Sequence, residues 1–240
     1  MSHDPMNILC VAAHPDDTEI LCAGTLARYV RQGHRVSIAV FTSGNMGDAR
    51  IAPDELAAIR KQETQAAAAL INARVIWGGV DDEHVFPDLK QRRRMIDILR
   101  EADPDVISTH SPNDYHPDHR YVGQLVFDAY FQKGLPHIPG QSQPACRFGQ
   151  APIYYLDNLG GIAFLPTEYV DISEVIDTKL AMLRCHTSQL AAMQELAGTD
   201  IVEIAETQAR FRGFAAGCQY AEAFTRLEAF QRGATRRILP

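Results

Sequence analysis

The sequence predicts an α/β protein with a Rossmann-like, mostly parallel sheet and helices on both faces. In the first half of the chain, short apolar runs rich in β-branched residues alternate with longer helical patterns. Such alternation indicates right-handed βαβ units. The 240 residues are 46% hydrophobic, enough for one sizeable core, and no internal repeat divides them. We therefore expect a single domain over residues 1–240.

Four strands are expected in the first half, each a run that fits a buried parallel strand. They span residues 7–12, 35–42, 74–77 and 105–109. The helices between and after them have apolar residues at helical spacing, as at Ile20, Leu21, Leu26 and Val30, with Gly33 as a stop. We expect these helices at residues 17–32, 54–70, 90–102 and 120–131.

The second half is less regular. Residues 133–150 contain three prolines and three glycines and are interpreted as a surface loop, because a strand at 153–156 follows directly. Another short strand is expected at 169–172. Two helical stretches, at 173–189 and roughly 201–230, complete the chain.

Composition excludes several classes of protein. The net charge of -7 and the absence of a basic stripe argue against binding to nucleic acid or to an anionic membrane surface. No apolar run approaches the roughly 20 residues that span a bilayer, and the first residues do not resemble a secretory signal. The five cysteines are scattered without a C-x-x-C pair, as in reduced proteins. We expect a soluble cytoplasmic protein without membrane insertion.

Two clusters of histidine and aspartate follow two of the expected strands. HPDDTE (14–19) comes directly after the first strand, and HPDH (116–119) lies a few residues beyond the fourth. In open α/β sheets, ligands bind in the crevice beyond the carboxyl ends of the strands. Both clusters therefore belong to the edge where a site is expected, although they are about a hundred residues apart in the sequence.

The residue types in these clusters fit a catalytic zinc site, in which three His or carboxylate ligands leave a fourth position for water. His14 and Asp17 can converge on one ion, and His116 and His119 offer one or two further imidazoles. Asp16 is then not needed as a ligand. A carboxylate beside a metal-bound water is suited to act as a general base.

Structural interpretations compete with this one. Asp17 could simply cap a helix, and His34 and His110 are interpreted as structural or surface histidines. Since Pro15 and Pro117 cannot both lie inside helices, we expect both clusters to be loops. Two such clusters at strand ends together favour a metal site.

The clusters resemble the paired motifs of the LmbE-like, or PIG-L, family of zinc-dependent N-deacetylases, whose members act in the mycothiol, bacillithiol and glycosylphosphatidylinositol pathways. The resemblance covers nearly the whole chain. Five further segments resemble family motifs: TSGNMGD (42–48), IRKQETQAAAALI (59–71), GGVDDEHVF (78–86), KLAMLRCHTSQ (179–189) and RGFAAGCQYAEAF (212–224).

The resemblance implies a role for each residue of the two clusters. It makes Asp16 the general base. His116 would stabilise the oxyanion or protonate the leaving amine, and Asp118 would orient an imidazole. The three metal ligands would be His14, Asp17 and His119.

Arg60 and Asp81 match family positions that bind sugar hydroxyls. In the segment that here reads GGVDDEHVF (78–86), the family often has Asp-Gly, whereas this chain has Asp81-Asp82. Glu63 is open to two interpretations, a partner of Arg60 or a solvated helix charge. His186 is open to a helix-capping role, a position behind the ligands or direct catalysis.

The resemblance implies a metal-dependent hydrolase that removes the acetyl group from an N-acetylated, sugar-type small molecule such as an N-acetylglucosamine conjugate. The expected cofactor is Zn2+, although another divalent metal would fit the same ligands. The resemblance also implies a homo-oligomer, either a trimer or a hexamer. Two alternatives share the metal centre: a non-catalytic regulatory metal-binding protein and a metal hydrolase of another ester or amide class. A nucleotide-binding Rossmann protein is disfavoured, because the first turn is acidic and lacks G-x-G-x-x-G.

Overall fold

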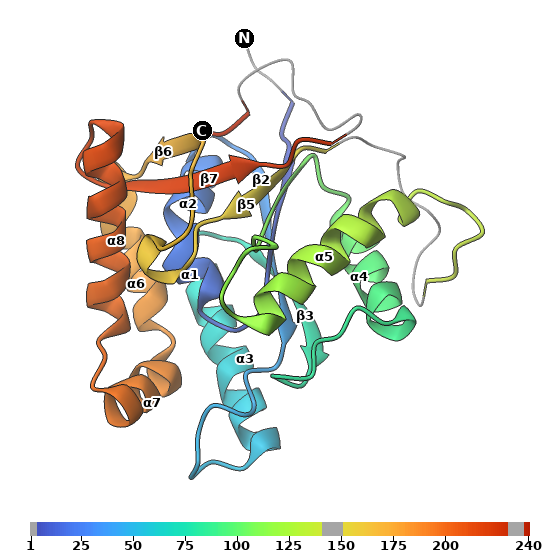
Figure 1. The fold of residues 1–240 in the computed structure, drawn as a ribbon, viewed down its shortest axis with the longest axis horizontal. Helices are drawn as coiled ribbons and strands as arrows, with labels where there is room; N and C mark the ends of the chain where they lie inside the picture. The colour runs from blue at the N-terminus through green and yellow to red at the C-terminus, as the bar shows by residue number, and fades with distance from the viewer. Residues whose placement is uncertain (1–3, 141–150, 230–237) are drawn as a thin grey trace.

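A single seven-stranded sheet organises the chain in the computed structural model, which describes residues 4–140, 151–229 and 238–240 (Figure 1). The strand order is β3-β2-β1-β4-β5-β7-β6. The first five strands in this order run parallel, and β7 runs antiparallel to both of its neighbours. The predicted mostly parallel α/β fold is confirmed. The strands are β1 Asn7–Ala12, β2 Arg35–Thr42, β3 Arg74–Val80, β4 Val106–Thr109, β5 Ile153–Leu156, β6 Glu168–Asp171 and β7 Ala221–Arg226.

Strand β1 is buried on both of its faces. It pairs with β2 on one side and β4 on the other. Because side chains alternate along a strand, Ile8 and Cys10 enter one hydrophobic core while Leu9 and Val11 enter the other. This explains why β1 is apolar throughout rather than at every second residue.

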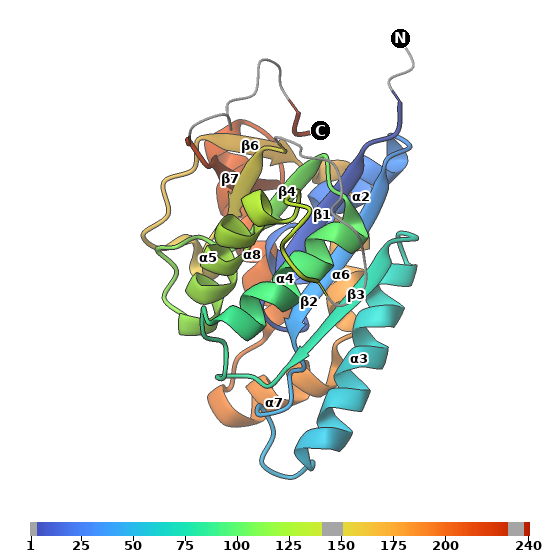
Figure 2. The ribbon, with the colours of Figure 1, turned by 90° about the vertical axis from the view of Figure 1, so that its right-hand side faces the viewer.

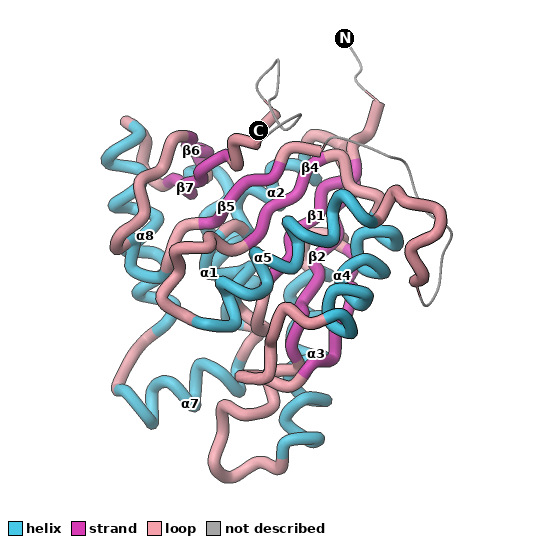
Figure 3. Tube along the Cα trace, turned by 45° about the vertical axis from the view of Figure 1, so that its right-hand side comes forward, coloured by secondary structure: helices cyan, strands magenta, loops and turns pink. Residues whose placement is uncertain are grey.

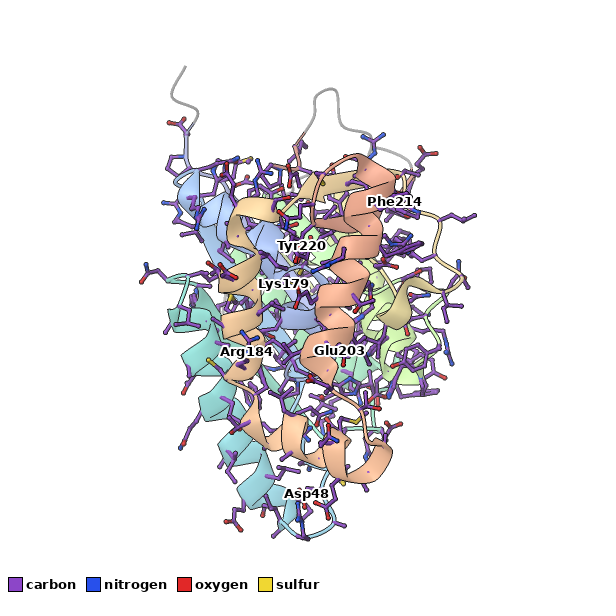
Figure 4. All side chains as sticks on the ribbon, turned by 90° about the vertical axis from the view of Figure 1, so that its left-hand side faces the viewer. Asp48, Lys179, Arg184, Glu203, Phe214 and Tyr220 are labelled. Carbon is purple, nitrogen blue, oxygen red and sulfur yellow. The ribbon has the colours of Figure 1, made fainter. Side chains whose placement is uncertain are left out.

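Helices cover both faces of the sheet, as predicted. Helices α4 and α5 pack together on one face (Figures 2 and 3), and α2, α3, α6 and α8 contribute to the core on the other (Figure 4). The helices are α1 Asp17–Leu21, α2 Ala23–Arg31, α3 Pro53–Ala69, α4 Leu89–Ala102, α5 Pro117–Gln132, α6 Ile176–Arg184, α7 Thr187–Ala197 and α8 Ile201–Ala216, with 3-10 turns at Leu159–Gly161 (η1) and Ser173–Val175 (η2).

The helix expected at residues 17–32 is interrupted at Cys22, whose φ is -151°. The buried carboxylate of Glu222 accepts hydrogen bonds from the backbone nitrogens of Gly24 and Thr25, at 3.0 and 2.7 Å. These first-turn nitrogens of α2 have no partners within the helix. A carboxylate from β7 therefore caps α2, which is a long-range contact that local spacing cannot reveal.

The C-terminal third differs most from the expectation. The helix expected at 173–189 ends at Arg184 as α6, and a separate helix, α7, follows from Thr187. The helix expected at 201–230 stops at Gly217, which has the left-handed backbone (φ 75°) that terminates many helices. Strand β7 then returns through the sheet. Phe230 and residues 141–150 of the expected loop lie outside the described residues.

Within the described residues, none of the helices has the length and apolar content that crossing a lipid bilayer requires.

A buried ion pair joins α6 to β7 behind the capped helix. The ammonium of Lys179 lies 2.6 Å from Glu222 and also donates to the carbonyl oxygen of Ile20 at 2.7 Å. Both charged side chains are almost fully buried, 1% and 3% exposed. Lys179 lies between α6 and α8 in Figure 4. The pair thus links the first helices of the chain to its last strand.

Replacing Lys179 with methionine should destabilise the protein strongly, because the Glu222 charge would remain buried without its cation. Breaking a buried pair in this way costs about 3–5 kcal/mol. Urea unfolding followed by circular dichroism measures the loss. The control is Arg50→Met, which removes an exposed ion pair with Glu195 and should change the free energy of unfolding by less than about 1 kcal/mol. Equal effects of the two substitutions would contradict this role of Lys179.

Candidate metal centre

The two histidine-aspartate clusters meet at the carboxyl edge of the sheet. His14 and Asp17 lie between the end of β1 and the first turn of α1. His119 lies in the first turn of α5 and His116 is its N-cap residue, so the second cluster opens a helix and is not the loop we expected. Pro117 occupies the first helical position, where its missing N–H costs nothing. The proline therefore marked a helix start rather than a loop.

Three donor groups converge at this edge. The Nδ1 atom of His14 lies 3.2 Å from Nε2 of His119 and 3.4 Å from an oxygen of Asp17. The remaining side of the triangle, from Nε2 of His119 to the other oxygen of Asp17, measures 3.3 Å. All three side chains are at most 15% exposed.

Each of the three distances is close to the spacing of two ligands around a tetrahedral ion, with Asp17 offering a different oxygen to each histidine. Nitrogen and oxygen ligands at about 2.0–2.1 Å from zinc lie about 3.3–3.4 Å from one another. Two imidazole nitrogens and a carboxylate are also donor types that zinc binds. The donor set of His14, Asp17 and His119 therefore fits one divalent cation.

Carboxylates behind the two histidines fix the orientation of their rings. Nε2 of His14 lies 3.2 Å from Asp118, and Nδ1 of His119 lies 3.2 Å from Asp114. With a metal in the triangle, the ring nitrogen that faces Asp118 or Asp114 would carry the proton, and the other nitrogen of each ring would present its lone pair to the ion. Asp118 was predicted to orient an imidazole. Asp114 was not predicted, because nothing in the sequence indicates that it faces His119.

His110 lies beside the triangle but does not complete it. It is fully buried, and its Nε2 accepts a hydrogen bond of 2.9 Å from the backbone nitrogen of Ala13. That lone pair is therefore already used. Burial, helped by the nearby His119, lowers the pKa of His110 to about 4, so the ring is neutral. This agrees with the structural interpretation of His110.

The charges around the triangle favour a cation. Burial alone would lower the pKa of His119, but the carboxylates of Asp17 and Asp114 outweigh burial and raise it to about 9. Burial opposes ionisation of Asp17 as well, yet His119 and His110 hold its pKa well below its usual range. The same negative field that favours a protonated imidazole also attracts a metal ion.

Asp16 is a buried carboxylate in a constrained position. Its φ of 105° lies in the left-handed region, which a non-glycine residue seldom adopts, and such conformations cluster at functional sites. The side chain lines the cavity beside His14 and Asp17. Burial, reinforced by the neighbouring Asp17, raises the pKa of Asp16 to about 7. This is the range in which a carboxylate exchanges a proton near neutrality.

His116 is held from both sides of its ring. Nδ1 accepts from the backbone nitrogen of Asp118 at 3.2 Å, and Nε2 lies 3.2 Å from the carboxylate of Glu83. Glu83 itself has a positive φ of 60°, and its backbone nitrogen donates to Asp118 at 2.8 Å. With Nδ1 accepting, Nε2 is the ring atom that carries a proton.

A cavity of about 320 Å³ opens over the triangle. Arg60 of α3 lines it and is 3% exposed. The backbone of Gly44 passes so close to this arginine that a Cβ there would lie 2.4 Å from its Cδ. Asp82 also lines the cavity and accepts from the Gly44 nitrogen at 2.8 Å. Asp81 instead is exposed, accepts from Asn45, and is not among the lining residues.

Glu63 anchors the helix that borders this cavity. Its carboxylate accepts from the Thr187 hydroxyl at 2.7 Å and from the nitrogen and hydroxyl of Ser188 at 2.8 and 2.6 Å. An anion at a helix N-terminus satisfies otherwise unpaired N–H groups. Glu63 is therefore neither a partner of Arg60 nor a solvated charge. Arg60 instead donates to Gln189 of the same helix, α7.

His186, just before α7, is also buried behind the site. Its Nε2 lies 3.3 Å from the carboxylate of Glu19, which is equally buried. His186 therefore lies behind the cavity wall and not in it.

The chain matches the sequence model of the PIG-L family, described as GlcNAc-PI de-N-acetylase, over residues 9–130. This range is slightly more than half of the chain. It contains both histidine-aspartate clusters and Arg60. The part of the chain that follows, which includes α7 and α8, lies beyond the matched range.

Three similar proteins illustrate the range of relatives. The diacetylchitobiose deacetylase of Thermococcus kodakarensis is 28% identical, over 92% of this chain and 82% of its own. The 4-oxalmesaconate hydratase of Pseudomonas putida is 24% identical, over 79% and 76%. A solved structure of the N,N'-diacetylchitobiose deacetylase of Pyrococcus horikoshii with an inhibitor superimposes with a TM-score of 0.79 at 28% identity, covering 93% of this chain and 84% of that one.

Proposed function

The chain belongs to the PIG-L family, and from this membership we propose that it is a metal-dependent hydrolase that removes the acetyl group from an N-acetylated sugar. The substrate class is that of N-acetylglucosamine and its conjugates, by similarity to relatives named as diacetylchitobiose deacetylases. One observation carries the proposal: the triangle of His14, Asp17 and His119, with the Asp16 carboxylate beside it.

His14, Asp17 and His119 are the proposed ligands, and zinc is the proposed ion. When bound, the ion would supply a Lewis acid that polarises the amide carbonyl and makes a water more acidic. Asp118 and Asp114 keep the two imidazoles in the tautomers that binding needs. Iron, cobalt, nickel or manganese would accept the same donors, so metal identity is an outcome of the tests below.

Asp16 is the proposed general base. It takes the proton of the water that attacks the amide carbon, and it is placed for this by its position beside the ligands. The ring of His116 lies 4.7 Å from that of His14, and its Nε2 proton would stabilise the oxyanion or protonate the departing amine. Acetate and a free amine are the products.

Arg60 is the proposed contact for sugar hydroxyls, because its side chain lines the cavity over the triangle. Asp81 was predicted for the same task. Since Asp82 lines the cavity and Asp81 does not, we propose Asp82 as the carboxylate that faces the substrate. The positive φ of Glu83 supports matching Asp82-Glu83, not Asp81-Asp82, to the Asp-Gly of the family.

We further propose that residues 1–240 form one domain, which is supported by the sharing of one sheet between the two cores. A homo-oligomer, either trimer or hexamer, remains a prediction from the resemblance, and a cytoplasmic location remains a prediction from the composition.

Acetate release distinguishes the proposed reaction from the alternatives. The purified protein should release acetate from N-acetylglucosamine conjugates, lose this activity after removal of metal with a chelator, and regain it with Zn2+. Acetyl esters are the comparison for a hydrolase of another class. A protein that binds metal but releases no acetate from any amide would support the regulatory alternative and contradict the deacetylase proposal.

Variants separate the proposed ligands from the proposed base. Asp16→Asn keeps the size of the side chain but cannot accept a proton, so it should retain metal and lose about 10²–10⁴-fold in rate. His119→Ala should lose both metal and activity. Asp118→Asn should weaken metal binding by about 10–100-fold, since it disturbs the orientation of His14 without removing a ligand. Elemental analysis and turnover on the same preparations provide the measurements.

Metal loss in Asp16→Asn would contradict the assignment of Asp16 as base. Full metal content in His119→Ala would exclude His119 as a ligand, even if the hydrolase class were correct.

A further inference from the structure

The cavity over the metal centre has two chemically different walls. The wall from the first half of the chain carries the metal triangle, Asp16 and Arg60. The wall from the second half is mainly apolar and consists of Leu159, Met193, Ile201 and Ile204 with Gln189 and Thr199. Burying a sugar hydroxyl against such a surface without a partner is unfavourable. The apolar wall therefore suits a part of the substrate other than the sugar hydroxyls.

A second cavity continues from this wall along α8. Its volume is about 470 Å³, and its lining residues are Gly160, Glu203, Ile204, Thr207, Gln208 and Phe211. Ile204 lines both cavities, and Gly160 directly follows Leu159 of the first. The two cavities therefore adjoin. We refer to the second as the α8 groove.

The α8 groove lies over one stripe of the helix. Ile204, Thr207, Gln208 and Phe211 are spaced by three and four residues, so they share one face of α8. The opposite face contributes Ala205 and Ala209 to the core. Phe211 remains 56% exposed, and no residue in the described part of the chain buries it. Its ring is held on one face by the guanidinium of Arg212, 5.1 Å away.

Apolar side chains continue beyond the groove. Ile162 and Leu165, which follow η1, are 77% and 88% exposed, and Phe214 of α8 is 88% exposed. Figure 4 labels Glu203 near one end of α8 and Phe214 near the other. Ile162, Leu165 and Phe214 do not line the groove.

The polar groups of the groove are few or already paired. The Gln208 side chain accepts from the Gly160 nitrogen at 2.8 Å and donates to the Asn158 carbonyl at 2.9 Å. Only the exposed Thr207 and Glu203 remain to meet a ligand. A second sugar, with several hydroxyls to satisfy, would find too few partners here. An aromatic or alkyl group needs no hydrogen-bond partner.

We propose that the α8 groove binds an apolar aglycone. The substrate would be an N-acetylglucosamine glycoside whose aryl or alkyl group lies between Ile204 and Phe211 while the acetamide faces the metal centre. The inference rests on the proposed deacetylase function and extends it to a substrate class. The presence of Ile204 in the lining of both cavities is the observation that connects the groove to the reaction.

The test compares acetate release from N-acetylglucosamine glycosides that differ only in the aglycone: methyl, phenyl and octyl, in both anomers, with N,N'-diacetylchitobiose as the two-sugar comparison. The octyl or phenyl glycoside should exceed the methyl glycoside in kcat/KM by roughly tenfold or more, since each buried methylene contributes several-fold. The gain should appear mainly in KM, because the aglycone is distant from the reacting bond.

Two exposed phenylalanines of α8 provide a matched pair of variants. Phe211→Ala should abolish most of the gain from the aglycone while the methyl glycoside keeps its rate. Phe214→Ala should change neither, because Phe214 does not line the groove. Binding of the octyl and methyl glycosides, measured by calorimetry, should show the same difference between the two variants.

Three results would overturn the inference. Equal kcat/KM for methyl and octyl glycosides would show that the groove takes no aglycone. A preference for diacetylchitobiose over both apolar glycosides would assign the groove to a second sugar. A change of oligomeric size in Phe211→Ala would assign it to a contact between copies of the chain. If no glycoside releases acetate, the deacetylase proposal fails, and calorimetry alone then decides whether the groove binds the alkyl group.

Discussion

The approach of Asp17 to two imidazoles at the carboxyl edge of the sheet is the constraint on which the rest of the site depends. His14 and Asp17 follow β1, and His119 follows β4, so the parallel pairing of these neighbouring strands brings the groups together. Desolvating so many polar groups is costly unless they are paired. The carboxylates of Asp114 and Asp118 pair with the outer ring nitrogens, and the inner donors are left for a cation.

The C-terminal third of the chain supports this centre and also shapes what it can bind. Glu222 caps α2, and through Lys179 it fixes α6, which leads into α7. Glu63 then holds α7 against α3. The apolar cavity wall and the α8 groove are built from elements beyond the range that matches the family. A shared metal chemistry could therefore serve different substrates through changes in α7 and α8, as expected when function resides in sites placed on a common fold.

The sequence predicted the parallel half of the fold well, because apolar strands and helical spacing are local signals. It also predicted which residues lie together at the sheet edge. The prediction failed where residues distant in the sequence determine the structure. The break between α1 and α2 at Cys22 depends on Glu222 of β7. Strand β7 was predicted as helix because apolar and polar residues do not alternate clearly in the segment after Gly217. Asp114 was missed, and both interpretations of Glu63 were wrong, because the partners of these two carboxylates become close only in the fold.

Anomalous diffraction from crystals of the metal-loaded protein tests the central claim most directly. Data collected on both sides of the zinc absorption edge locate the ion without reference to activity. The account predicts one anomalous peak about 2.0–2.2 Å from Nδ1 of His14, the Asp17 carboxylate and Nε2 of His119. A peak bound by His116 and Glu83, or by His110 in place of His14, would contradict it.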